Sequence, residues 1–185
     1  NGLYRPNTLP PADQRARLAE LGTVQTQAAY PRPWAMAGVT PFRRYKLWPY
    51  LGGVRTPLIV SWPARIKDGG AVRRQYVDVI DIGPTLLEAA GARFAEVVGG
   101  ERQLPVAGRS FGATFTNPEA AARTTQYFEL RGNRAITDGG WRAVAMHKCG
   151  APFEADRWEL YNTDVDFAET VDLAQRHPQV LARLQ

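Results

Sequence analysis

The 185-residue chain has little cysteine, no long apolar run and no dense basic block, and each absence excludes a class of protein. Its one cysteine, Cys149, rules out an internal disulfide framework and is compatible with either a cytoplasmic or a periplasmic location. No run approaches the roughly 18 apolar residues that cross a bilayer, so we expect no membrane span. The remaining composition, with 44% hydrophobic and 22% charged residues, is typical of a soluble globular protein.

Positive charge is concentrated in the first part of the chain. Residues 1–75 carry a net charge of +9, whereas residues 76–185 carry −4. Such a basic part could face an anionic small molecule, a nucleic acid or an acidic partner surface. Because the basic residues form no block and do not gather on one helix face, we predict no nucleic-acid partner.

Strand and helix signals alternate in the middle of the chain. The apolar residues 58–62 lie between two prolines and predict a buried strand. A second strand is expected at residues 76–81, followed by a helix over residues 82–90 that Asp81 would cap. Strand followed by helix is the alternation of an α/β layer.

The pattern changes after about residue 120. Turn-forming residues separate four short strands, expected at residues 126–130, 134–137, 141–147 and 158–161. Helical structure is expected from about Glu169, with a last helix starting at His177-Pro178. These residues predict a small α+β domain, 121–185, with a four-stranded antiparallel sheet and a terminal helix.

The beginning of the chain has no apolar core of its own. Residues 1–38 are rich in proline, glycine and isolated aromatic residues, which suggests a chain cut out of something larger.

Four ordered segments carry a resemblance to a known family. They are residues 40–63, with Lys46 and the pair Gly52-Gly53; residues 77–91; residues 126–141; and residues 158–162, Trp-Glu-Leu-Tyr-Asn. In order and spacing they resemble the C-terminal portion of the sulfatases, which belong to the alkaline phosphatase superfamily. This resemblance implies that residues 1–120 are the C-terminal part, at the edge of the sheet, of the main sulfatase α/β domain. The runs at residues 34–38 and 126–129 are most similar to a subgroup of bacterial arylsulfatases.

The resemblance assigns one catalytic residue to this chain. Lys46 matches the lysine that, in similar sulfatases, binds the sulfate ester and stabilises charge on the leaving oxygen. A lysine supplies a compact charge for a sulfate oxygen, and glycines let backbone approach a ligand closely. One position departs from the family pattern, because Leu51 stands where an acidic residue usually precedes the glycine pair.

Neighbouring residues are weaker candidates for the same site. Arg43, together with Arg44 and Arg55, could extend an anionic pocket, although solvated surface positions are an equal alternative. Trp48 and Tyr50 could flank an aromatic substrate, although packing against the loop explains their spacing better.

Two apparent nucleophiles fail on context. The family's nucleophile is a cysteine or serine in a Cys/Ser-x-Pro-x-Arg motif, oxidised to formylglycine, and Ser61 begins a run that fits the short pattern. We reject Ser61 because the bulky Trp62 follows it and because the true motif belongs far upstream. Cys149 lacks the proline and arginine that the motif requires, so we expect an ordinary loop thiol.

No metal site is expected within the chain. The family holds a divalent cation, usually calcium, with Asp-Asp and Asp-Asn pairs that we expect upstream of Asn1. Asp78 and Asp81 flank a helix start, and neither His147 nor His177 has a partner at ligand spacing. We therefore expect no cofactor in this chain and Ca²⁺ in the complete protein.

The leading hypothesis is the C-terminal part of an arylsulfatase, which hydrolyses sulfate ester substrates only in the complete protein. The chain alone is predicted to be inactive. One alternative is a non-catalytic, basic binding or assembly module derived from a sulfatase. A phosphatase-like relative is the other alternative, because sulfate and phosphate esters look alike to a single cation.

Overall fold

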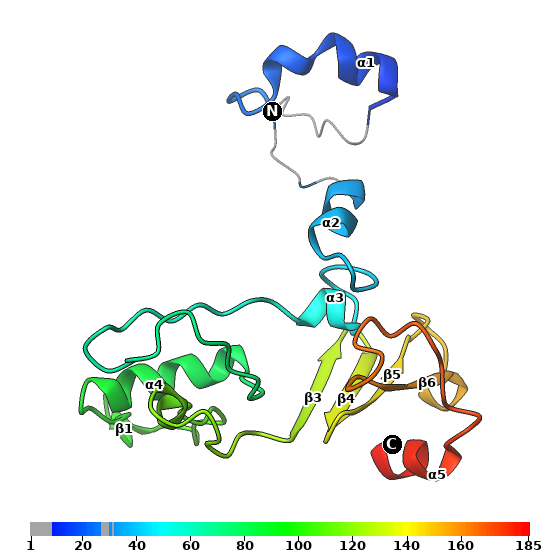
Figure 1. The fold of residues 1–185 in the computed structure, drawn as a ribbon. Helices are drawn as coiled ribbons and strands as arrows, with labels where there is room; N and C mark the ends of the chain where they lie inside the picture. Colours follow the sequence, from blue (N-terminus) through cyan, green and yellow to red (C-terminus); the bar gives the residue numbers. More distant parts are fainter. Residues whose placement is uncertain (1–8, 27–29, 31) are drawn as a thin grey trace. The chain divides into compact units, whose positions relative to one another are not determined.

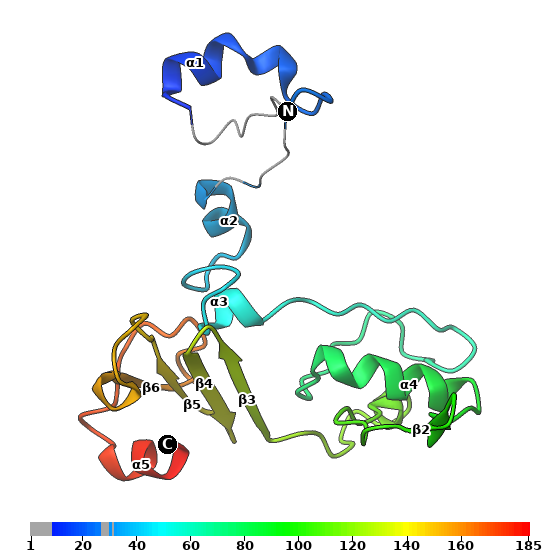
Figure 2. The same ribbon diagram turned by 180° about the vertical axis from the view of Figure 1, so that it is seen from behind.

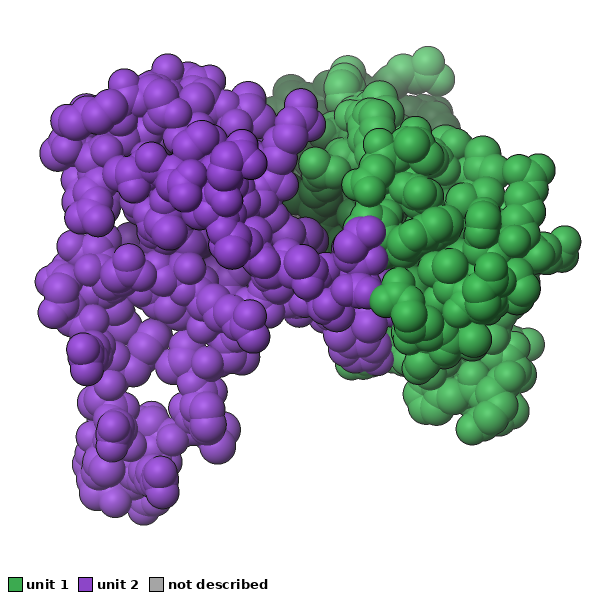
Figure 3. Space-filling view, turned by 60° about the horizontal axis from the view of Figure 1, so that its bottom comes forward, with its two compact units in different colours: residues 1–56, 128–135, 140–185 green, residues 57–127, 136–139 purple. Residues whose placement is uncertain are grey.

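The computed structural model describes residues 9–26, 30 and 32–185. These residues form two compact units, shown in different colours in Figure 3. Described residues of the first unit are 9–26, 30, 32–56, 128–135 and 140–185, and the second unit comprises 57–127 and 136–139. The predicted domain boundary between residues 120 and 121 stays a prediction.

A four-stranded antiparallel sheet is the largest ordered element (Figures 1 and 2). Its strand order follows the chain: β3 (Thr125–Leu130), β4 (Asn133–Asp138), β5 (Trp141–Ala145) and β6 (Trp158–Asn162). Each strand is therefore the neighbour of the next, as short turns require. The prediction of four strands is confirmed.

Both faces of strand β5 are covered, because Arg142, Ala143, Val144 and Ala145 are all buried. The register pairs Arg142 with Tyr161 and Ala143 with Leu160 on β6, so side chains alternate between two faces. On one face Val144 and Tyr161 form an apolar core with Ala135 and Tyr50. The helix α5 (Pro178–Leu184) contacts β5, and the ring of Trp141 lies 5.2 Å from that of His177.

The predicted last helix is confirmed, whereas the expected helical structure from about Glu169 is wrong. Helix α5 has Pro178 in its first turn, where a missing N–H costs nothing. Glu169 has a φ of 58°, which interrupts a right-handed helix. Its side chain is instead buried in an ion pair with Arg142.

The second unit is built around helix α4 (Ile82–Ala89), which confirms the helix expected over residues 82–90. The one-turn helix η3 (Val79–Asp81) precedes it, and a further turn, η4 (Gly112–Phe115), contacts it. The short strands β1 (Val97–Val98) and β2 (Glu101–Arg102) form a hairpin. Asp81 does not cap α4 as predicted, because its carboxylate accepts the N–H of Asp78 in a capping box around η3.

The strands predicted at residues 58–62 and 76–81 are wrong for this structure. Residues 58–62 are irregular, and Leu58, Ile59 and Val60 are 50%, 90% and 40% exposed. A strand needs a neighbour to pair its N–H and C=O groups, and within the described residues none lies beside this segment. The apolar pattern is therefore present without the sheet that would bury it.

Short helices make up the remainder of the described chain. They are α1 (Pro11–Ala16), η2 (Leu18–Glu20), α2 (Arg32–Gly38), α3 (Leu51–Val54) and η5 (Phe153–Ala155). None of the helices in the described ranges has the length and apolar character needed to cross a membrane.

We predict that Asp81 stabilises the second unit in a pH-dependent way. Its side chain is 4% exposed and accepts hydrogen bonds from the N–H of Arg109 (2.8 Å) and from Arg123 (2.5 Å). Burial opposes ionisation, but these donors and the Asp78 N–H outweigh it and lower the pKa of Asp81 below 3.8. The stabilisation is therefore complete above pH 4 and is lost as the pH falls through the lowered pKa.

Asp81→Asn should destabilise the second unit by about 3 kcal/mol at pH 7. The difference from the wild type should shrink as the pH falls below 4. Hydrogen exchange of the α4 amides in urea measures this unit specifically. Asp68→Asn, which breaks the exposed pair with Arg73, is the matched control and should have a smaller effect. Equal losses in both variants would contradict the prediction.

Candidate functional site

The loop between residues 42 and 51 presents Lys46 to solvent. Its two near neighbours Arg44 and Leu47 have φ angles of 66° and 79°. A left-handed conformation costs a non-glycine residue about 1–2 kcal/mol and persists only where the surroundings determine it. The loop is therefore held in a specific, strained shape on both sides of Lys46.

The glycine pair of α3 explains how the loop is held. A Cβ on Gly52 would collide with the carbonyl oxygens of Arg43 and Arg44, and one on Gly53 would collide with the Trp48 carbonyl oxygen. The loop thus folds back onto α3 with backbone against backbone. Glycine is required at both positions because no side chain fits.

A buried ion pair fastens the loop at both ends. Arg142 and Glu169 are fully buried, with Nε of Arg142 3.0 Å from Oε1 of Glu169. The Arg142 guanidinium also donates to the Pro49 carbonyl, and Oε2 of Glu169 accepts the Leu51 N–H at 2.8 Å. Before Lys46, Arg43 donates to the Glu169 carbonyl at 3.0 Å.

Glu169 is held as an acceptor despite its burial. Burial raises the pKa of its carboxyl, while the Arg142 charge and the Leu51 N–H favour the ionised form. A buried carboxylate is tolerated where its oxygens are paired and hydrogen-bonded. Both oxygens meet that condition here.

A second carboxylate, Glu159, orders the aromatic residues beside the loop. Its Oε2 accepts the hydroxyl protons of Tyr50 (2.8 Å) and Tyr161 (2.6 Å). Burial, and next the adjacent carboxylate, raise the pKa of both phenols, so they remain donors at physiological pH. Arg43 lies over the Tyr50 ring at 4.6 Å and donates to the Tyr161 hydroxyl.

The candidate residues therefore occupy different environments. Arg43 is engaged by several groups, and Tyr50 is 3% exposed with its hydroxyl committed to Glu159. Trp48 is half-buried, with the Arg44 guanidinium 4.6 Å from its ring. Within residues 43–55, Lys46 is the cation that makes no ion pair, hydrogen bond or ring contact with the described part of the chain.

Sequence reasoning missed the residues that support this loop. Arg142 lies in a strand pattern and Glu169 in an expected helix, and neither has a local signal of pairing. Glu159 lies in β6, within the Trp-Glu-Leu-Tyr-Asn run that carried the resemblance. Its position two residues before Tyr161, on the same face of the strand, was the available signal for its contact with the Tyr161 hydroxyl.

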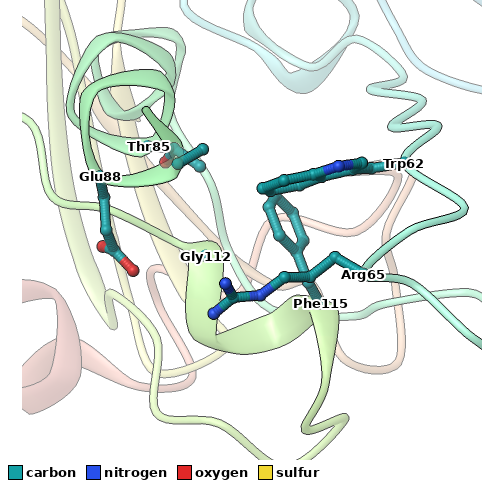
Figure 4. A pocket seen from close by; sticks show the side chains of 7 residues that line it. Trp62, Arg65, Thr85, Glu88, Gly112 and Phe115 are labelled. Carbon is teal, nitrogen blue, oxygen red and sulfur yellow. The ribbon is translucent and has the colours of Figure 1, made fainter. Parts of the chain in front are cut away.

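The run beginning at Ser61 lies at a small hollow in the second unit (Figure 4). Trp62, Arg65, Glu88 and Phe115 line it, and the Trp62 and Phe115 rings meet edge to face at 6.0 Å. Ser61 itself is exposed and does not line the hollow. This agrees with a structural reading of the motif.

The remaining candidates form no metal centre in the described ranges, which hold no group of three or more His, Cys, Asp or Glu side chains able to bind one ion. Nδ1 of His147 lies 3.1 Å from the Asp156 carboxylate, and His177 contacts Trp141. Asp78 and Asp81 are both used around η3.

A family model and the related sequences both relate this chain to sulfatases. Residues 44–184 match the family described as N-sulphoglucosamine sulphohydrolase, C-terminal. An uncharacterized sulfatase of Schizosaccharomyces pombe is 33% identical over 174 residues, which are 90% of this chain and 30% of that protein. A sulfatase of Formosa agariphila is 29% identical over 149 residues, 75% of this chain and 26% of that protein.

Solved structures show the same fold. One from Bacteroides thetaiotaomicron, described with the metabolism of multiple glycosaminoglycans, has a TM-score of 0.58 at 22% identity and covers 80% of this chain and 30% of that one. A crystal structure of Ps i-CgsB with k-i-k-neocarrahexaose has a TM-score of 0.57 at 22% identity, covering 78% and 30%. The chain spans about three-tenths of the length of the relatives it matches. The expected fold class is confirmed.

We predict that Gly52→Ala disrupts the loop around Lys46. The added Cβ would meet the carbonyls of Arg43 and Arg44, so the loop must move or the unit must lose about 1–3 kcal/mol. Gly69→Ala is the matched control, because a Cβ there meets nothing within 4 Å. Amide chemical shifts of residues 43–48 and thermal unfolding measure both effects. If Gly52→Ala changed neither the amide shifts nor the thermal unfolding, the close approach of Gly52 to the loop carbonyls would not be needed to hold the loop.

We also predict that Glu169→Ala lowers the free energy of unfolding of the first unit by about 3–5 kcal/mol, because it removes the carboxylate that faces the buried Arg142 charge. Arg157→Gln removes an exposed pair with Asp172 and serves as the control with little change. Urea unfolding followed by tryptophan fluorescence reports mainly on this unit, which contains Trp48, Trp141 and Trp158. Similar losses in the two variants would contradict the prediction.

Proposed function

The chain belongs to the N-sulphoglucosamine sulphohydrolase C-terminal family, and from this premise we propose that it is the C-terminal part of an arylsulfatase of bacterial type. The complete protein would hydrolyse sulfate esters of aryl substrates. Support for the family comes from the match over residues 44–184 and from sulfatase relatives. Support for the aryl specificity comes from the arylsulfatase-like runs at residues 34–38 and 126–129.

Lys46 is the proposed contribution of this chain to catalysis. Its ammonium group is exposed and unpaired within the described residues, while the backbone around it is held by glycine contacts and a buried ion pair. A preorganised cation of this kind stabilises charge that develops on a leaving oxygen without reorganising during the reaction. This combination of a free charge and a fixed loop is the observation that carries the proposal.

Neighbouring residues are assigned smaller contributions. Trp48 has a half-exposed ring that could contact an aromatic leaving group. Arg43 and Tyr50 would act on substrate only by exchanging their present hydrogen bonds for new ones. We propose for these two a role in shaping the loop as well as any contact with substrate.

The nucleophile and the metal are proposed to come from segments outside this chain. The described residues do not fit a calcium site, since their carboxylates do not gather into a set of ligands. Ser61 is exposed on an irregular segment, and Cys149 lacks the required motif. We therefore assign formylglycine and Ca²⁺ to the remainder of a longer protein, and no catalytic step in this chain passes through either.

We predict that this chain alone does not hydrolyse 4-nitrophenyl sulfate. In a protein that also contains the upstream segments, Lys46→Ala should lower kcat/KM by about two to three orders of magnitude. Lys67→Ala is the control, because Lys67 belongs to the second unit and donates to the Pro63 carbonyl at an exposed position. Release of 4-nitrophenol is the measurement, and circular dichroism should show the fold unchanged in both variants.

Three results would overturn the assignment. Hydrolysis by this chain alone that disappears in Ser61→Ala would make Ser61 a nucleophile after all. Equal activity of Lys46→Ala and the wild type in the longer protein would remove Lys46 from the site. Hydrolysis of 4-nitrophenyl phosphate in preference to the sulfate would favour a phosphatase instead.

A further inference from the structure

A second site lies in the first unit, at the turn that joins β3 to β4. An open hollow of about 560 Å³ is found there. Its lining residues are Arg131, Gly132, His147, Cys149, Gly150 and Phe153. No part of the Lys46 loop belongs to it.

His147 is fixed in this hollow. Its Nδ1 lies 3.1 Å from both carboxylate oxygens of Asp156, and its ring stacks on Phe153 with centroids 4.2 Å apart. The side chain is 10% exposed. Its Nε2 has no hydrogen-bond partner among the residues that the structure describes. A histidine oriented through one nitrogen keeps the other available for a ligand.

Arg131 lines the hollow from a strained backbone conformation. Strands β3 and β4 are joined by Arg131 and Gly132, which have φ angles of 57° and 81°. Asparagine, aspartate or glycine is usual at the first position of such a turn, and arginine there is strained by about 1–2 kcal/mol. Its guanidinium makes no hydrogen bond, ion pair or ring contact with another described residue. An unpaired cation on a strained residue indicates a function for that charge.

Gly132 brings the turn against the histidine. A Cβ at this position would overlap the His147 ring, with Cδ2 and Cγ at 2.5 and 2.8 Å. The backbone of the turn that carries Arg131 therefore packs against the His147 ring, and both residues line the hollow. Gly132 therefore does two things: it lets the chain reverse between β3 and β4, and it lets the turn pack against the His147 ring.

The hollow favours a negative charge. None of its lining residues is acidic. Asp156 is already paired with Arg134 at 2.7 Å as well as with His147, and Glu129 accepts the Gly132 N–H at 2.7 Å. Phe153, 48% exposed, adds an apolar wall.

We propose that this hollow binds a small anionic ring compound, with its anionic group on Arg131 and its ring beside His147 and Phe153. An aryl sulfate and a sulfated sugar share this chemistry. The site is separate from the proposed catalytic contact at Lys46 and does not require the chain to be active. Within a sulfatase it would hold a second anionic group of a larger substrate or product.

Cys149 gives a direct test, because it is the only cysteine and it lines the hollow. Alkylation by iodoacetamide is followed by intact mass with 4-nitrophenyl sulfate, glucose 6-sulfate, sodium sulfate or 4-nitrophenol present. We expect at least one of the two ring sulfates to slow alkylation at concentrations where sulfate and nitrophenol have no effect. Whichever of the two ring sulfates protects more strongly shows whether the hollow prefers an aryl sulfate or a sulfated sugar.

Variants distinguish this site from Lys46. Arg131→Asn keeps a residue that tolerates a positive φ, and it should raise the protecting concentration about tenfold. Lys148→Gln, a neighbouring cation outside the lining, and Lys46→Ala should both leave protection unchanged. Ligand-induced amide shifts of Gly132 and Gly150 should also weaken in Arg131→Asn and persist in Lys148→Gln and Lys46→Ala. These shifts report binding without depending on the reactivity of the thiol.

Three outcomes would overturn the proposal. These are an absence of protection by either ring sulfate, equal protection in Arg131→Asn and the wild type, and loss of protection in Lys46→Ala. The first two would leave the catalytic role of Lys46 untouched, so the two proposals fail independently.

Discussion

The buried ion pair between Arg142 and Glu169 is the constraint on which the first unit depends. Two charges taken out of water are costly unless every polar atom finds a partner. Here the partners are the carbonyl of Pro49 and the N–H of Leu51, which both belong to the loop that follows Lys46. Satisfying the pair therefore requires that this loop close onto the sheet, so the desolvation cost enforces one loop conformation.

The sequence predicts regular elements well where their stabilising partners are close along the chain. The four strands and their turns are local hairpin patterns, and α4 and α5 have clear starts. The segment at residues 58–62 has an equally clear strand pattern but remains irregular and exposed, because a strand depends on a neighbour that local pattern does not specify. Propensity and apolar pattern indicate that a segment can form a strand, and a neighbouring strand to pair with decides whether the strand forms.

The candidate site divides in the same way. Lys46 and the glycine pair lie close together in the chain, and a family resemblance identified them. Arg142 and Glu169 meet the loop from positions more than 90 residues away, and a single sequence contains no periodicity that links them. The helix expected from Glu169 illustrates the difficulty, because a favourable local pattern gave way to a buried charge pair at a positive φ.

Two exposed cations of the first unit are built on a common plan. Lys46 is flanked by left-handed Arg44 and Leu47, and Arg131 is itself left-handed. In each case a glycine that tolerates no Cβ presses the turn onto its support, Gly52 on the loop backbone and Gly132 on the His147 ring. A buried carboxylate holds each of these contacts in place: Glu169 accepts the Leu51 N–H, and Asp156 pairs with His147. The buried charges are thus paired internally, whereas Lys46 and Arg131 make no ion pair with the described residues. The same physical arrangement occurs twice in the first unit, and it supports both proposals of an anion contact, at Lys46 and at Arg131.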